Sequence, residues 1–145
     1  MDNVHYQYPT SNNPYKILNS QKAQIAQLIR GKREEARIEY ARTFCYEVLS
    51  AYWDYILKGY ETSWKVPKLE IKYKLETDAV KIAKVIGVSL SALELMDAGY
   101  FVGVLYTTLL PDEVRSRLGA YYTPPSLVNR LIKNVSLSGF SWENG

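Results

Sequence analysis

The chain has 145 residues, which is enough for one domain with a buried core. Its 47% hydrophobic and 23% charged residues are typical of a globular protein and exclude a disordered chain. The formal charge of +3 is spread thinly along the sequence, so composition permits nucleic-acid contact without predicting it. The aromatic residues are mainly tyrosine, which suits half-buried surfaces and interfaces as well as a helical core.

Cysteine and histidine are nearly absent. The single cysteine, Cys45, lies in an apolar stretch and has no intrachain partner, so we expect a buried thiol. With His5 as the one histidine, a metal site of the His/Cys type is effectively excluded. The first residues show no signal-sequence pattern, and the longest apolar run, 98–104, is too short to span a membrane. We therefore expect a cytoplasmic protein.

The N-terminal third is predicted to be an irregular arm followed by helix. Residues 1–19 contain two prolines and a polar TSNN cluster without periodicity, so we expect them to be irregular. Ser20 favours a helix that begins near Gln21 and is interrupted at Gly31. From Lys32 a wide apolar stripe predicts a long helix to Leu57: Ala41, Phe44, Val48, Tyr52 and Tyr55.

Gly59 is expected to end the long helix, and residues 59–74 change character. Leu69, Ile71 and Tyr73 alternate with charged residues at the period of a strand. A single short strand has no evident partner in this sequence. We expect a loop with extended pieces.

Residues 76–97 predict two short helices. Thr77 is expected to cap the first, which runs through Ile86, Gly87 to end it, and Ser89 or Ser91 to begin the second. The spacing of small and apolar residues resembles the helix-turn-helix of DNA-binding repressors, at Ala83, Gly87, Leu93 and Met96.

The second of these helices offers no Arg, Lys, Asn or Gln to read base edges. An ordinary helical hairpin is therefore the default, and DNA binding is the alternative. If DNA binds here, the candidate contacts are Lys84, Ser89 and Ser91.

Residues 98–110 are apolar nearly all round and predict a central buried helix that continues from residue 91. Gly99 and Gly103 would let a neighbouring helix approach closely. Pro111 then favours a new short helix, with two acids at its start and Arg115 and Arg117 toward its end.

The stretch 118–133, LGAYYTPPSLVNRLIK, combines a chain reversal with a helix start. Gly119 permits a tight turn, and Thr123 followed by two prolines is typical of a helix N-terminus. The free N–H groups of such a terminus suit a carboxylate or phosphate. On these residues alone, two interpretations stay open: a ligand-facing site, or a capped surface helix with the neighbouring tyrosines in the core.

The segment VLYTTLLPDEVRSRLGAYYTPPSLVNRLI, residues 104–132, resembles a known block. It is similar to motif X of the adenine-specific DNA methyltransferases of restriction-modification systems. In that family, motif X precedes the domain that binds S-adenosylmethionine. The resemblance implies that Thr123 contacts the methionine carboxylate of that cofactor, that Tyr121 and Tyr122 shape the pocket wall, and that Pro124 begins the supporting helix.

The family also uses a glycine-rich Asp-Pro-x-Cys-Gly-x-Gly loop to hold the cofactor and an Asn-Pro-Pro-Tyr loop to orient the adenine. Neither loop is present in these 145 residues. The resemblance therefore implies no catalytic residue in this chain and no S-adenosylmethionine bound to it alone. We expect residues 136–145 to be a tail leading to an absent catalytic domain.

Together, these patterns predict a mainly α-helical module of about five helices over residues 20–135, with a long N-terminal helix. The expected role is the N-terminal module or fragment of an adenine-specific DNA methyltransferase, which meets DNA through the full enzyme. The alternative is a stand-alone helical DNA-binding or protein-interaction module. A homodimer through the tyrosine-rich helix is a further expectation.

Overall fold

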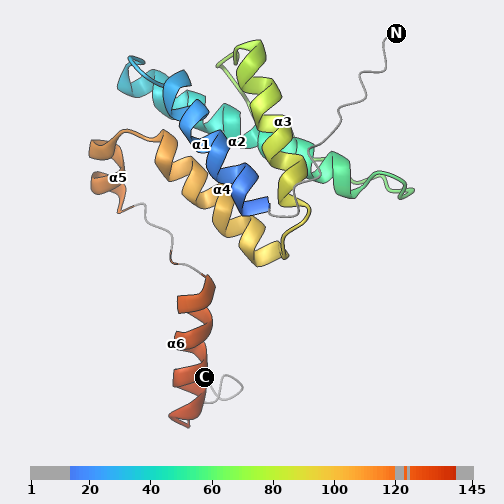
Figure 1. Cartoon of the computed structure of the whole chain (residues 1–145), viewed down its shortest axis with the longest axis vertical. Helices are drawn as coiled ribbons and strands as arrows, with labels where there is room; N and C mark the ends of the chain where they lie inside the picture. The colour runs from blue at the N-terminus through green and yellow to red at the C-terminus, as the bar shows by residue number, and fades with distance from the viewer. Residues whose placement is uncertain (1–13, 120–122, 124, 140–145) are drawn as a thin grey trace.

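The computed structural model describes residues 14–119, 123 and 125–139 (Figure 1). These residues form six helices and no strand, so the predicted mainly α fold is confirmed, with one helix more than the approximate number expected. The helices are α1 (Pro14–Leu28), α2 (Glu34–Ile56), α3 (Thr77–Leu90), α4 (Leu95–Leu109), α5 (Asp112–Leu118) and α6 (Pro125–Leu137).

The first helix begins earlier than the sequence suggested. α1 starts at Pro14, inside the stretch 1–19 that was expected to be irregular, and not near Gln21. Proline is tolerated in a first helical turn, because its missing N–H has no partner to lose there. The remainder of the expected arm, residues 1–13, lies outside the described residues.

α2 is the predicted long helix. The chain reverses at Gly31, which has a φ of 77°, and α2 begins after Arg33 with two acids in its first turn. Acidic side chains at this end interact favourably with the helix dipole. After α2, Gly59 has a φ of 91° and residues 60–76 have no regular secondary structure, as expected.

The core lies among the first four helices. α2 contacts both α3 and α4, and α1 contacts the same two helices, while α2 runs behind the others in Figure 1. The largest fully buried side chains come from all four helices and from the start of α5: Ile25, Tyr40, Phe44, Val48, Ile86, Leu90, Leu105, Leu109, Leu110 and Val114.

Gly87 does not end a helix as predicted. α3 continues through it to Leu90, and the chain turns at residues 91–94. A Cβ on Gly87 would lie 2.4 Å from the Val48 carbonyl oxygen and 3.0 Å from the Tyr52 backbone nitrogen. The glycine is therefore needed where α2 and α3 pack closely, and the helix-turn-helix spacing that placed the turn at Gly87 was wrong. Met96, which that motif would bury, is 68% exposed.

Two glycines of α4, Gly99 and Gly103, were also predicted to let a neighbouring helix approach closely, and they differ in burial. Gly103 is buried, as expected of a packing position. Gly99 is exposed, and a Cβ built on it would meet nothing within 4 Å, so the prediction for Gly99 was wrong. α4 also begins at Leu95 and not at residue 91, because residues 91–94 form the turn.

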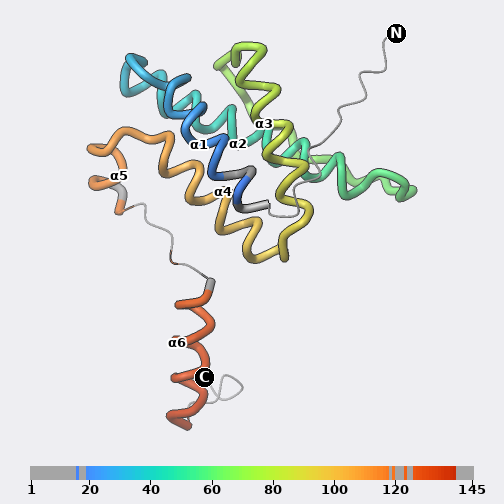
Figure 2. The backbone as a smooth tube through the Cα atoms, in the orientation of Figure 1, coloured from blue at the N-terminus to red at the C-terminus, as the bar shows by residue number. Residues whose placement is uncertain are grey.

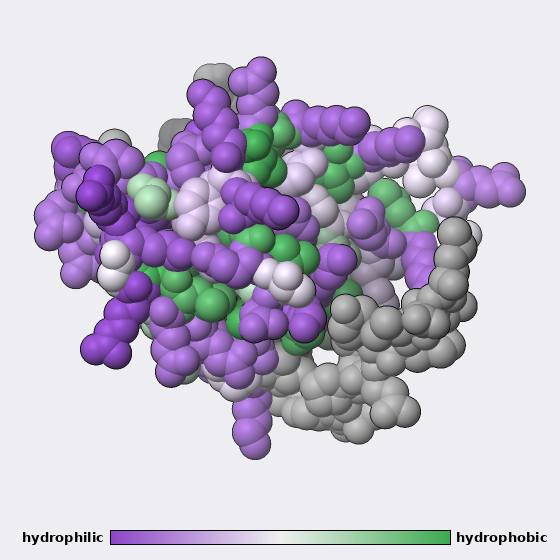
Figure 3. All heavy atoms as spheres, turned by 90° about the horizontal axis from the view of Figure 1, so that it is seen from above, coloured by the Kyte–Doolittle hydropathy of each residue, from purple (hydrophilic) through white to green (hydrophobic). Residues whose placement is uncertain are grey.

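α6 projects away from the bundle (Figure 2) and contacts α4. The bundle face in Figure 3 carries hydrophilic side chains with smaller hydrophobic patches between them. That mixture is ordinary for a protein surface, where apolar atoms still contribute more than half of the exposed area.

Candidate cofactor-binding segment

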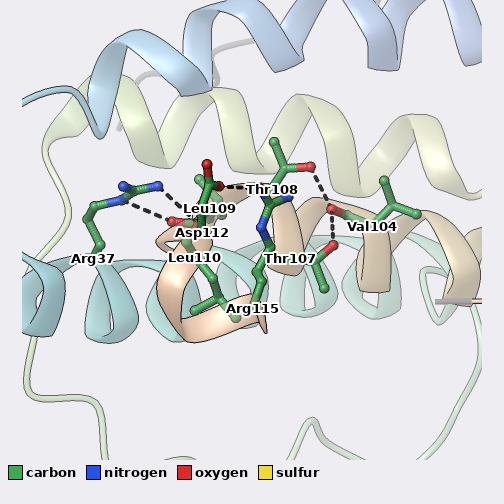
Figure 4. Close-up of polar contacts among 8 residues, drawn as sticks. All are labelled: Arg37, Val104, Thr107, Thr108, Leu109, Leu110, Asp112 and Arg115. Atoms are coloured by element: carbon green, nitrogen blue, oxygen red, sulfur yellow. Dashed lines mark hydrogen bonds and ion pairs between the residues drawn. The ribbon is translucent and has the colours of Figure 1, made fainter. Parts of the chain in front are cut away.

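The first half of the segment 104–132 is fixed to the bundle. Leu109, Leu110 and Val114 are almost completely buried. Arg37 on α2 donates hydrogen bonds from Nε to the Leu109 carbonyl oxygen (3.3 Å) and from Nη2 to the Leu110 carbonyl oxygen (3.1 Å; Figure 4). Carbonyl groups at a helix end have no partner within the helix, and the guanidinium group satisfies these two. The junction of α4 and α5 is therefore stabilised by apolar packing and by hydrogen bonds from the Arg37 guanidinium group.

Other polar residues of this segment are used in local structure. The Thr107 and Thr108 hydroxyls both donate to the Val104 carbonyl oxygen, at 2.9 and 2.8 Å. Asp112 forms an ion pair with Arg115 within α5 (Figure 4). These contacts account for the side chains of Thr107, Thr108, Asp112 and Arg115 without a ligand.

α5 is also linked to α2. The Arg117 guanidinium group lies 3.6 Å from the carboxylate of Glu34, at the start of α2. α5 then ends at Gly119, whose φ of 57° and ψ of 29° are left-handed, a conformation that favours glycine. The backbone conformation expected of Gly119 is therefore present at the end of α5.

The structure describes one of the four predicted cofactor-binding residues. Thr123 is exposed, two residues before α6 begins at Pro125. Tyr121, Tyr122 and Pro124 lie outside the described residues. The first turn of α6 contains no acidic residue, so its free N–H groups and positive dipole end are not compensated by a carboxylate of that turn. Thr123 therefore lies near a helix end that suits an anion.

α6 carries an uncovered apolar stripe, which we define as Leu127, Val128, Leu131, Ile132 and Val135. Leu127 is 49% exposed and Leu131 is 60% exposed. Asn129, Arg130 and Lys133 occupy the opposite face, so the helix is strongly amphipathic. An apolar stripe of this kind is normally buried against another element, and the main contact of α6 within the described residues is with α4.

Two of the three predicted DNA contacts, Ser89 and Ser91, donate their hydroxyl groups to backbone carbonyl oxygens of α3. The Ser89 hydroxyl donates to the Val85 carbonyl oxygen at 2.8 Å, and the Ser91 hydroxyl donates to the Val88 carbonyl oxygen at 2.6 Å. Lys84 is exposed beside a hollow of about 260 Å³ between α2 and α3. Only Lys84 of the three thus has a polar group without a partner on its own helix.

A second polar cluster was not predicted from the sequence. The Lys32 Nζ atom lies 2.8 Å from a Glu76 carboxylate oxygen and donates to the Tyr73 hydroxyl at 3.1 Å. The ammonium group also lies 5.0 Å from the centre of the Tyr40 ring. The hydrogen bond from Lys32 lowers the pKa of Glu76, and burial raises the pKa of Tyr40 to about 12. The Tyr40 hydroxyl is buried without a hydrogen-bond partner.

This cluster joins the loop to the bundle and brings together residues more than forty positions apart. No local sequence pattern signals such a contact. Its components form a cation–π and ion-pair contact that fixes the end of the loop at the start of α3. Among the described residues, no group of three or more His, Cys, Asp or Glu side chains is arranged to hold a metal ion, here or elsewhere.

The tyrosines of α2 divide between the core and the surface. Tyr40 and Tyr52 are buried, whereas Tyr55 is 47% exposed. Cys45 is buried as expected, and burial raises the pKa of its thiol to about 12. Of these three tyrosines, only Tyr55 has a ring that a second copy of the chain could contact, and the homodimer stays a prediction.

No protein family, curated protein or solved structure matches this chain. None of the helices in the described part of the chain is both long and apolar enough to cross a bilayer.

Proposed function

We propose that this chain is the N-terminal helical module of an S-adenosylmethionine-dependent, adenine-specific DNA methyltransferase of the restriction-modification type. The observation that carries the proposal is the arrangement of the segment 104–132. Its first half is anchored in the bundle, Gly119 ends α5 in a left-handed conformation, and an exposed Thr123 precedes α6 with its uncovered apolar stripe. This arrangement suits a segment that completes a site on another domain.

In the assembled enzyme, the stripe on α6 packs against the catalytic domain. Burying apolar surface of this kind contributes about 25 cal/mol for each Å² removed from water. Thr123 then faces the methionine carboxylate, because the N-terminus of α6 presents free N–H groups and a positive dipole end. Tyr121 and Tyr122 form the adjoining wall of the pocket.

The reaction is transfer of the methyl group from the cofactor sulfonium to the exocyclic amino nitrogen of adenine. The glycine-rich loop and the Asn-Pro-Pro-Tyr loop that this chemistry uses come from the catalytic domain, since these 145 residues contain neither. This chain helps to bind and position the cofactor, and it supplies no catalytic residue. DNA is bound through the full enzyme.

A second candidate is a stand-alone protein-interaction module. The uncovered stripe on α6 favours it equally, since any apolar partner could cover that face. Thr123 and the two tyrosines before it distinguish the two candidate functions. A helix that only packs against a protein partner does not need a hydroxyl group and two tyrosines before its N-terminus.

The DNA that encodes the chain gives the first test. We expect a segment with the glycine-rich cofactor loop and the Asn-Pro-Pro-Tyr loop, either in the same reading frame or in an adjacent gene. The absence of both loops from the frame and from the adjacent genes would remove the methyltransferase proposal and leave the interaction module.

Thr123→Val gives the second test, in the chain joined to that catalytic segment. The substitution removes the hydroxyl group but keeps the shape, and we expect roughly tenfold weaker binding of S-adenosylmethionine, since a hydrogen bond to a charged group is worth about 1.5–3 kcal/mol. Thr108→Val is the matched control, because its hydroxyl is bonded to the Val104 carbonyl oxygen. Equal affinities of the two variants would contradict the role of Thr123.

A further inference from the structure

A groove lies between the last turns of α2 and the loop that follows it. Its volume is about 460 Å³. Trp64 holds the loop in place, since its ring centre lies 5.0 Å from that of Trp53 on α2 and its backbone N–H donates to the Thr62 hydroxyl at 3.1 Å. In Figure 1 this end of α2 projects on the side away from α5, so the groove is separate from the segment 104–132.

The groove is positively charged. Three exposed lysines line it, Lys58, Lys65 and Lys68, and none of them forms an ion pair within the described part of the chain. Asp54 is the one carboxylate on the lining. The hollow between α2 and α3 shares Asp54 and Lys58 with this groove and adds a fourth lysine, Lys84. Unpaired ammonium groups around one hollow attract a polyanion.

Two exposed aromatic rings line the same groove as the lysines. Tyr60 is 72% exposed and Trp64 is 45% exposed, both on the groove lining. An exposed aromatic ring offers a flat face on which an unpaired base can stack. The lining contains no Arg, Asn or Gln, the side chains that most often read base edges. The groove therefore has the means to bind phosphates and stack bases, without the means to read sequence.

We propose that this groove binds single-stranded nucleic acid without sequence preference. The lysines contact successive phosphates, and Tyr60 and Trp64 stack on unpaired bases. A duplex would satisfy the lysines but leave the rings unused, because its bases already stack on one another. The proposal is independent of the methyltransferase assignment, since no residue of the segment 104–132 lines the groove.

The test is fluorescence anisotropy with the whole chain and a labelled single-stranded DNA of about 12 nucleotides and mixed sequence, a length within the span of known single-strand sites. We expect binding at about 50 mM salt that weakens with a log–log slope of roughly −2, since each neutralised phosphate of a single strand contributes about −0.7. Lys65→Glu with Lys68→Glu should weaken binding by tenfold or more, as an order of magnitude for two lost phosphate contacts.

Two further variants separate charge from stacking. Lys74→Glu with Lys133→Glu makes the same change in net charge at exposed sites off the groove, and it should change the affinity less than about twofold. Tyr60→Ala removes a mostly exposed ring and should weaken single-strand binding by roughly tenfold, with the fold intact by circular dichroism. No binding of the single strand, equal losses in the two lysine pairs, or tighter binding of the matching duplex would overturn the proposal.

Discussion

At the scale of single residues, one missing Cβ sets how closely two helices pack. Gly87 lies in the middle of α3, where glycine is intrinsically unfavourable compared with alanine. Its position against the Val48 carbonyl oxygen and the Tyr52 backbone nitrogen explains why alanine would not fit. Both neighbours belong to the backbone of α2, so they cannot move aside as a flexible side chain can. The packing of α2 on α3 depends on this residue.

Gly87→Ala should therefore destabilise the chain by about 2 kcal/mol, within the usual cost of inserting a methyl group into a packed core. Urea unfolding followed by circular dichroism measures the change. Gly99→Ala is the matched control, since it also lies inside a helix but has open space around it. The control should gain up to about 1 kcal/mol from helix propensity. A neutral or stabilising Gly87→Ala would show that α2 and α3 do not approach so closely.

At the scale of elements, α4 is apolar and α6 is amphipathic. The two helices differ in how much of their apolar surface the rest of the chain covers. Leu109, at the end of α4, is completely buried, whereas Leu131 in the middle of α6 is 60% exposed. α6 thus contributes little apolar burial to the stability of this chain. Its stripe is available for another domain, and that availability is the premise of the proposed function.

Leu131→Ala should change the free energy of unfolding of the chain by less than about 0.5 kcal/mol, because the side chain is already largely in water. Leu109→Ala should cost about 3 kcal/mol, since it leaves a cavity in the core. Urea unfolding of the two variants in parallel makes the comparison. A loss of about 2 kcal/mol or more for Leu131→Ala would mean that the stripe is covered within the chain itself.

At the scale of the whole molecule, local sequence patterns predicted most elements. The apolar stripe predicted α2, and Gly59, Pro111 and Gly119 marked real boundaries. The start of α1 was missed because Pro14 is compatible with either a loop or a first helical turn. The role of Gly87 was missed because a glycine in a helix can mark an end or a close contact, and here the backbone of a distant helix decides.

The candidate site was predictable only in part, for the same physical reason. The pattern of α6 predicted its amphipathic character, and its apolar stripe is indeed exposed on one side. The contacts of Arg37 with the end of α4 and of Lys32 with the loop join residues far apart in sequence, so no local pattern contains them. Whether Thr123 meets a cofactor stays a prediction.

The central claim is that this chain supplies one wall of an S-adenosylmethionine pocket. A single helix N-terminus and one hydroxyl contribute roughly 1–4 kcal/mol, which is at most enough for millimolar affinity. The most direct measurement is a calorimetric titration of S-adenosylmethionine into the catalytic segment, with and without this chain. We predict binding at least tenfold tighter with the chain present and no measurable binding to the chain alone. Equal affinity with and without the chain, or micromolar binding by these 145 residues alone, would contradict the claim.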